Sequence, residues 1–396
     1  IGLKNSQVRE KLMGELGTKV KIEITRKNGK KPLDFVIIRD NIPINSVDAY
    51  YMVDDKIGYI KLNSFSRSTV EEVQDAMRDL KSKGMENLIF DLQGNGGGLL
   101  YAAHQLADEF LSGDKLIVYS EGRAQPRSDL KAGRKGAWEN GQLIILTDEY
   151  SASASEILSG AIQDWDRGLV VGRRSYGKGL VQRPIDLTDG SQIRLTIARY
   201  YTPSGRFIQK PYDDPEAYDK DLTQRYLNGE FTNADSIILP DSLKHETLIN
   251  KRTVYGGGGI MPDVFVPLDT NGITDYYRNL VQKGYLNGFV LEYVDQNRDE
   301  ILKSHQDFSS FRNHFKINKA IMDEFFEYVK KEDPELEYND EQYKTSEALF
   351  TLRMKAVIAQ DIWGYNEFYQ IYNDTNEIVM KAVEIIQKGE YDNKLK

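Results

Sequence analysis

The sequence contains no cysteine, which excludes a cysteine nucleophile, a disulfide framework and a thiolate zinc site. Its histidines are few and show no metal-ligand spacing, so we expect no metal site; they are His104, His245, His305 and His314. No run approaches the roughly 18 uninterrupted apolar residues of a membrane-spanning helix, so we expect no integral membrane span. The lack of cysteine fits the cytosol and equally an envelope protein that needs no disulfides.

The chain carries a net negative charge, which disfavours binding to a polyanion. Its 396 residues carry a net charge of −9, so nucleic acid and anionic membrane are disfavoured as partners of the whole chain. Residues 1–40 differ, with a basic excess that a solvated surface explains more simply than an anionic partner does. The length predicts two or three domains. The first residues contain neither an initiator Met nor a signal peptide, and they are typical of a fragment or a mature form.

Strand and helix patterns alternate between residues 45 and 212. Short apolar strands are predicted at 87–91, 115–120, 142–148 and 168–172, with a longer β-rich segment at 186–201. Helices are predicted at 68–81, 99–111 and 154–165, the first opened by a capping box from Ser68 to Glu71. This alternation predicts an α/β core with a largely parallel sheet.

The two flanks differ from this core. Residues 1–40 contain a helix at 4–16 and strands near 20–24 and 34–39, joined by a turn at 27–30, which is too little for a complete domain. The acidic stretch 213–221 is interpreted as a linker. Residues 273–396 are predicted to be mostly helical, with aromatic anchors.

The stretch Gly172–Gln182, "GRRSYGKGLVQ", follows an apolar strand and contains most of a phosphate-binding P-loop. A P-loop needs a Ser or Thr after its lysine and then a helix, but here Gly179 and a β-like segment with Pro184 follow. Nucleotide binding is therefore disfavoured. Two interpretations of Lys178 remain: a solvated side chain at a glycine-rich turn, or a general base in an apolar pocket, where the charged amine is poorly solvated.

A lysine base needs a nucleophile, and "SASASEI" at 151–157 offers one at a predicted helix start. Ser153 and Glu156 fit a capping box, so a purely structural role is the simpler interpretation of this stretch alone. The catalytic alternative is that Ser153 attacks a carbonyl while the free amides beside it hold the oxyanion. "DLQGNGGG" at 91–98 is either a strand-to-helix turn or a second source of such amides.

Together these segments resemble the C-terminal processing peptidases, or tail-specific proteases, a family of serine endopeptidases with a Ser–Lys dyad. The matching blocks are Asp91–Gly98, Ala152–Glu156, Gly172–Gln182, Tyr200–Arg206 and Gly256–Val264. Their order agrees with the family, as does the spacing between the serine and the lysine. The departures are Gln93 and Gly96, where the family usually has Arg and Pro.

The resemblance implies a role for individual residues. Ser153 would be the nucleophile, Lys178 the general base and Gln182 the residue that orients the lysine. The oxyanion donors would be the backbone amides of Ala154 and of Gly98, with Gly97 as the other glycine considered. Asp164 matches an acidic family position near the dyad, with a possible supporting role. The resemblance implies no metal and no cofactor.

The resemblance also implies an architecture: a crotonase-like α/β peptidase core at 41–270, preceded at 1–40 by the last part of a PDZ domain. Residues 271–396 would form a helical C-terminal region. The carboxylate-binding loop of a PDZ domain is missing from 1–40, so peptide capture there would be impaired.

The activity implied is cleavage of unstructured proteins near or from their C-terminal tails. The resemblance also allows an adaptor or activator protein as a partner. The implied location is the bacterial periplasm or cell envelope, and the resemblance allows a membrane anchor in the full-length protein. The sequence leaves the oligomeric state open. A peptide-binding scaffold of the same fold without catalysis is the alternative, and a P-loop nucleotide-binding protein is the less favoured third hypothesis.

Overall fold

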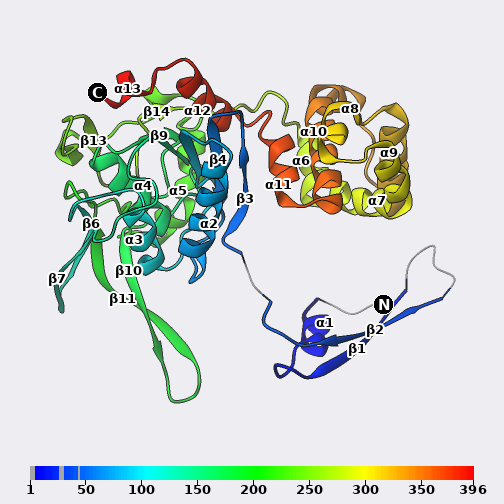
Figure 1. Ribbon diagram of the computed structural model, residues 1–396, viewed down its shortest axis with the longest axis horizontal. Coiled ribbons are helices and arrows are strands. Elements are labelled where there is room, and N and C mark those ends of the chain that lie inside the picture. Colours follow the sequence, from blue (N-terminus) through cyan, green and yellow to red (C-terminus); the bar gives the residue numbers. More distant parts are fainter. Residues whose placement is uncertain (1–4, 26–30, 43–44) are drawn as a thin grey trace. The chain divides into compact units, whose positions relative to one another are not determined.

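The computed structural model describes residues 5–25, 31–42 and 45–396, and the chain divides into two compact units, Ile1–Asn45 and Ser46–Lys396 (Figure 1). The first unit contains one helix and a two-stranded antiparallel sheet: α1 (Asn5–Leu12), β1 (Lys19–Ile24) and β2 (Leu33–Ile38). The predicted helix and strands are confirmed, although the helix ends four residues before the predicted position 16. The predicted turn at 27–30 lies outside the described residues.

The second unit is built on a six-stranded sheet with the order β14-β9-β8-β5-β4-β3. Every neighbouring pair is parallel except β3 with β4, so the expected largely parallel sheet is confirmed. The strands in chain order are β3 (Val47–Met52), β4 (Ile57–Leu62), β5 (Asn87–Asp91), β8 (Gln142–Thr147), β9 (Leu169–Gly172) and β14 (Val264–Phe265).

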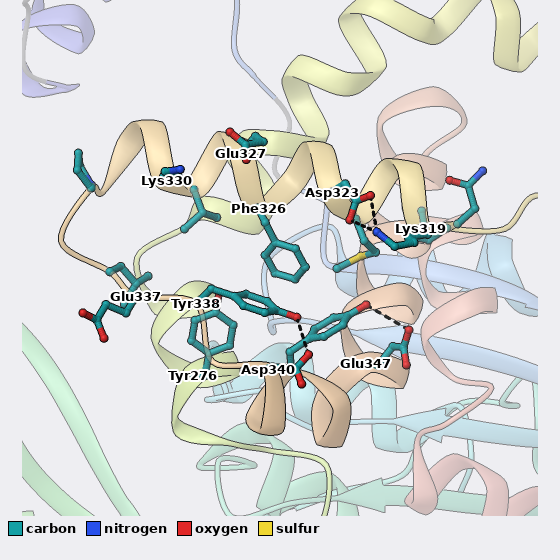
Figure 2. Close-up of a pocket in the computed structure, with 17 residues that line it drawn as sticks. Tyr276, Lys319, Asp323, Phe326, Glu327, Lys330, Glu337, Tyr338, Asp340 and Glu347 are labelled. Carbon is teal, nitrogen blue, oxygen red and sulfur yellow. Dashed lines mark hydrogen bonds and ion pairs between the residues drawn. The ribbon is translucent and has the colours of Figure 1, made fainter.

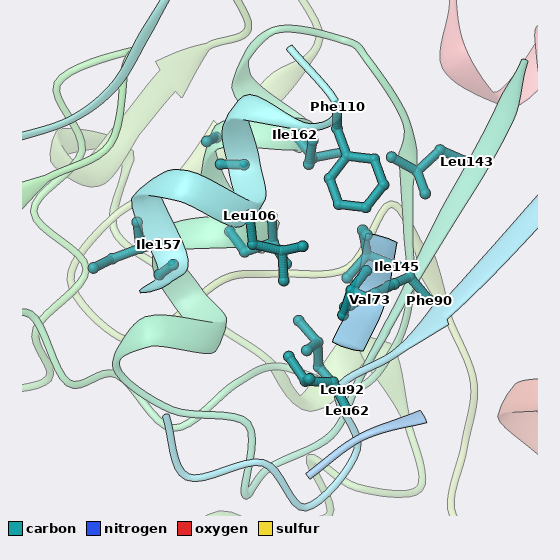
Figure 3. Packing of buried hydrophobic residues seen from close by; sticks show 14 of the residues in the cluster. Leu62, Val73, Phe90, Leu92, Leu106, Phe110, Leu143, Ile145, Ile157 and Ile162 are labelled. Carbon is teal, nitrogen blue, oxygen red and sulfur yellow. The ribbon is translucent and has the colours of Figure 1, made fainter. Parts of the chain in front are cut away.

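Helices cover both faces of this sheet because its central strands are apolar on both sides. Phe90 and Ile145 point to one face and form a buried cluster with side chains of three helices, as Figure 3 shows. The adjacent residues Ile89 and Ile144 point to the other face. The first face carries α2 (Thr69–Ser82), α3 (Leu100–Asp108) and α4 (Ala154–Asp164), and the second carries α12 (Glu377–Gln387) and α13 (Tyr391–Leu395).

A second, antiparallel sheet has the order β10-β11-β6-β7. Its strands are β6 (Leu116–Gly122), β7 (Gln125–Lys131), β10 (Leu180–Asp186) and β11 (Gln192–Tyr201). The predicted strand 115–120 therefore does not belong to the parallel sheet, because an apolar strand pattern does not specify which sheet the strand joins. The β10–β11 pair projects as a long hairpin in Figure 1.

Two local predictions are wrong. The stretch 213–221 is no linker but opens helix α5 (Pro215–Leu227), because the Asp214 carboxylate accepts hydrogen bonds from the first free amides of that helix. The Ser68 side chain makes no capping hydrogen bond. The Glu72 carboxylate, in the first turn of the same helix, accepts hydrogen bonds from the backbone amides of Ser46 and Val47 outside the helix. Short elements complete this part: η1 (Ala234–Ser236), η2 (Asp241–Leu243), β12 (Lys244–Glu246) and β13 (Thr253–Tyr255).

The predicted helical C-terminal region is confirmed, and its first six helices share an aromatic core of their own. They are α6 (Asp275–Gln282), α7 (Tyr285–Ser304), α8 (Phe308–His314), α9 (Lys319–Glu332), α10 (Asp340–Ile362) and α11 (Tyr365–Tyr372). Figure 2 shows Phe326 directed toward Tyr338 beside a cavity of about 850 Å³, with 4.7 Å between the two ring centroids. None of the described helices is long and apolar enough to cross a bilayer.

Candidate active site

One cavity of about 610 Å³ is lined by residues from four segments that are far apart in the sequence, one of which contributes only Phe65. The glycine loop after β5, the start of α4 and the β10–β11 hairpin all contribute to its lining. Six of the predicted site residues lie there: Gly97, Gly98, Ser153, Ala154, Lys178 and Gln182. The structure therefore brings the predicted nucleophile, base, lysine partner and oxyanion donors into a single cavity, and their catalytic roles stay predictions.

Ser153 occupies a sharp turn between β8 and α4. Its backbone has φ 58° and ψ −110°, a region that residues with a side chain rarely adopt. Strain of this kind costs about 1–3 kcal/mol and persists only where the surroundings enforce it. A strained strand-to-helix turn is also a recurrent way to present a nucleophile above a helix N-terminus.

The buried carboxylate of Glu156 helps to hold the Ser153 backbone in this strained conformation. It accepts hydrogen bonds from the backbone amides of Ser153 at 2.8 Å, Gly177 at 2.7 Å and Lys178 at 2.8 Å. The Ser175 hydroxyl also donates to it, at 2.5 Å. Burial raises the pKa of this carboxyl, and the four hydrogen bonds offset part of that shift. One carboxylate thus ties the serine turn to the lysine loop.

A second tie comes from Tyr200 on β11, whose hydroxyl lies 3.1 Å from the backbone carbonyl of Ser153 and also bonds the carbonyl of Lys178. Burial raises the pKa of Tyr200 well above its ordinary value, so the hydroxyl remains a proton donor. The two candidate catalytic residues are therefore held through their amides by Glu156 and through their carbonyls by Tyr200.

Asn95 fixes the glycine loop against the serine turn. Its side chain donates to the carbonyl of Leu62 and accepts from the amide of Gly97, while its backbone carbonyl accepts from Ala152. Gly97 has φ +98°, and a Cβ there would lie 2.8 Å from the Cβ of Ser153. Only glycine allows the two loops to approach this closely.

Two backbone amides at this contact are available to a ligand. Within residues 45–396, the N–H groups of Gly98 and Ala154 have no hydrogen-bond acceptor, although both residues line the cavity. Free amides near a nucleophile can stabilise the negative charge of a tetrahedral intermediate. Gly98 and Ala154 are the donor pair predicted from the sequence, and their role in an oxyanion hole stays a prediction.

Lys178 is half-buried, and Gln182 is exposed at the start of β10. Among residues 45–396 the Lys178 amine has no hydrogen-bond or ion-pair partner, so it shares the cavity with the Ser153 hydroxyl without a hydrogen bond between them. Such contacts are often looser without substrate. The loop leads into a strand rather than a helix, so the geometry of a P-loop is absent from this segment.

Residues 56–217 match the family model described as peptidase family S41. The matched segment contains Ser153, Lys178 and Gln182. Over 235 residues the chain is 37% identical to a carboxy-terminal-processing protease of Bartonella bacilliformis, covering 57% of this chain and 53% of that protein. A carboxyl-terminal-processing protease of Synechocystis is 36% identical over 205 residues, covering 50% of this chain and 47% of that protein.

Solved structures include a protein with sequence similarity to this chain. A photosystem II D1 C-terminal processing protease is 30% identical with a TM-score of 0.38, over 52% of this chain and 56% of that one. Residues 276–364 match a family of unknown function, DUF8443. The chain spans about half the length of the curated relatives it matches.

Asp164 is the one predicted site residue that does not line the cavity. It lies at the opposite end of α4 from Ser153 and forms a fully buried ion pair of 2.5 Å with Arg206. Its other carboxylate oxygen accepts from the amide of Ser204. In the part of the chain that the structure describes, no cluster of acidic residues and histidines could hold a metal ion.

Sequence reasoning missed the residues that support the S41 site. Glu156 was considered only as half of a capping box, and Asn95 and Tyr200 were quoted within motifs without a role. The capping box predicts the bond between the Ser153 amide and Glu156, which the structure contains. Most of the other partners lie 19 or more residues away along the chain, and no local pattern reports such contacts. One sequence feature could have indicated these contacts: all three are polar residues beside predicted apolar elements. Polar groups buried in such places need hydrogen-bond partners.

Proposed function

We propose that this protein is a serine endopeptidase that cleaves protein substrates near or from their C-terminal tails. The observation that carries the proposal is the shared cavity, in which Ser153 and Lys178 lie with the unpaired amides of Gly98 and Ala154. The S41 match of this segment and the names of its relatives support the same activity.

In the proposed mechanism, neutral Lys178 takes the proton of the Ser153 hydroxyl as the serine oxygen attacks the scissile carbonyl. The amides of Gly98 and Ala154 stabilise the resulting oxyanion. Lys178 then protonates the leaving amine, and the acyl-enzyme forms. Water, deprotonated by the same amine, hydrolyses that ester and releases the new C-terminus. Gln182, which lines the same cavity, orients the lysine.

The wider setting belongs to the same proposal. Unstructured protein tails are the substrates, the core is crotonase-like, and residues 1–40 are the end of a PDZ domain. The proposal also includes an adaptor or activator protein as a partner and a location in the bacterial envelope. The alternative of a peptide-binding scaffold is favoured by one observation only, the missing hydrogen bond between Ser153 and Lys178.

The test is cleavage of a chemically unfolded protein, followed by mass spectrometry of the products. The parent should produce fragments, and the Ser153→Ala and Lys178→Ala variants should lose at least about a thousandfold in rate. Equal cleavage by all three proteins would show that the dyad assignment is wrong. Peptide binding by the parent without cleavage would favour the scaffold.

A further inference from the structure

The candidate active-site cavity has an unusual charge balance for this acidic chain. Among its 17 lining residues only Lys178 and Arg194 have basic side chains, and neither Asp nor Glu lines it. The buried carboxylate of Glu156, next in sequence to the lining residue Ile157, accepts hydrogen bonds from three backbone amides and a hydroxyl. The cavity is therefore cationic in a protein of net charge −9.

The permanent positive charge of this cavity is that of Arg194, on the hairpin wall. Arg194 on β11 pairs with Pro184 on β10, and alternation along the strands places both on the face that lines the cavity with Gln182 and Gln192. Arg194 is exposed and, among residues 45–396, forms no ion pair or hydrogen bond through its guanidinium.

The hairpin's own carboxylates, Asp186 and Asp189, form no ion pair with Arg194. Asp186 accepts a hydrogen bond from the Gln192 side chain at 2.7 Å, and Asp189 accepts from the Ser191 hydroxyl at 2.6 Å. An unpaired guanidinium facing a cavity with no acidic lining is suited to bind a carboxylate in bidentate geometry.

We propose that Arg194 forms a carboxylate-binding subsite that selects the substrate segment entering the cavity. The ligand is a peptide carboxylate, either the free C-terminus or an Asp or Glu side chain near the scissile bond. This inference rests on the proposed function and adds a substrate preference to it. The subsite lies on the hairpin, so it acts on substrate choice and not on the chemistry at Ser153.

The chain provides a matched control in Arg183. It is an exposed arginine on β10, next to Pro184, and it pairs with Leu195 on the opposite face of the hairpin. It does not line the cavity. The Arg183→Gln and Arg194→Gln variants remove the same charge from the same hairpin, so they separate a local contact from a general electrostatic effect.

The experiment compares kcat/KM for three peptides of otherwise identical sequence: one with a free C-terminus, one amidated, and one amidated with a Gln near the cleavage site replaced by Glu. The parent should prefer at least one carboxylate-bearing peptide over the neutral amide by about three- to fivefold. Arg194→Gln should abolish that ratio, and Arg183→Gln should keep it. Which peptide is preferred identifies the source of the carboxylate.

An unchanged ratio in Arg194→Gln, an equal loss in Arg183→Gln, or no preference in the parent would overturn the subsite. Failure of the proposed function looks different, because the parent would then cleave none of the peptides. In that case the same three peptides, fluorescein-labelled, are titrated against the three proteins by anisotropy. A carboxylate preference lost only in Arg194→Gln would support the subsite without proteolysis, and its absence would overturn both proposals.

Discussion

The two walls of the candidate active site are built in opposite ways. On the serine wall, the carboxylate of Glu156 and the side chain of Asn95 are buried and hydrogen-bonded to backbone groups of neighbouring loops. On the hairpin wall, Arg194 and Gln192 are exposed. The comparison suggests a division of labour in which the first wall fixes the reacting atoms and the second contacts variable substrate.

The division has a physical reason. A nucleophile and its oxyanion donors must be held within a fraction of an ångström, which requires packing and satisfied hydrogen bonds on all sides. Substrate tails differ in sequence, and an exposed strand pair can accept many of them without repacking a core. Substitutions on the first wall should therefore affect stability and catalysis strongly, whereas those on the second should hardly affect stability.

The largest effect is expected from Gly97→Ala. The substitution forces a side chain onto a backbone with φ +98° and brings its Cβ to 2.7 Å from the Ala152 carbonyl. We expect unfolding free energy to fall by about 3 kcal/mol and cleavage to be lost. Urea denaturation measures the first. Gly96→Ala is the control, because its Cβ would meet nothing within 4 Å. Equal stability of the two variants would contradict the close approach.

A slightly smaller loss is expected from Glu156→Gln. The amide would place an NH₂ group where three backbone amides and one hydroxyl need an acceptor. We expect a loss of about 2–3 kcal/mol by urea denaturation. Glu71→Gln, at an exposed position in the first turn of α2, should change stability by less than about 0.5 kcal/mol. If the two variants behave alike, Glu156 does not tie the loops together.

Tyr200→Phe should cost less stability but affect turnover. It removes the hydroxyl that bonds the carbonyls of Ser153 and Lys178 and keeps the buried ring. We expect a loss of about 1 kcal/mol, with a several-fold lower kcat and little change in KM. Tyr119→Phe is the control, because that hydroxyl makes no hydrogen bond with the described residues. A change confined to KM would argue against a positioning role.

The smallest effect is expected on the hairpin. Leu195 on β11 is 50% exposed, so Leu195→Ser should change unfolding free energy by less than about 0.5 kcal/mol. Thermal denaturation followed by circular dichroism measures it. A loss comparable to that of Glu156→Gln would show that the hairpin is part of the stabilising core, and the contrast between the two walls would fail.

Sequence reasoning predicted the elements with strong apolar periodicity, such as α2, and the short central strands such as β5 and β8. It placed 115–120 in the wrong sheet because strand pairing is a long-range choice that the strand pattern does not encode. It missed α5 because that helix is mostly exposed and lacks an apolar stripe, although Asp214 before Pro215 is a typical helix start.

At the site, motifs predicted which loops would meet but not what holds them. Ser153 and Lys178 were found because each lies in a compact local motif after a strand. The bond from Glu156 to the Lys178 amide joins two motifs 22 residues apart, and the cationic balance of the cavity appears only when β10 and β11 stand beside the serine turn. These features depend on folding, which a single sequence does not display.

The central claim is that Ser153 is a nucleophile activated by Lys178. The most direct measurement is the intact mass of the protein after exposure to a fluorophosphonate, followed by peptide mapping. We predict one adduct on Ser153 in the parent, and its loss in Lys178→Ala although the serine is still present. An adduct on another residue, or undiminished labelling of Ser153 in Lys178→Ala, would contradict the account.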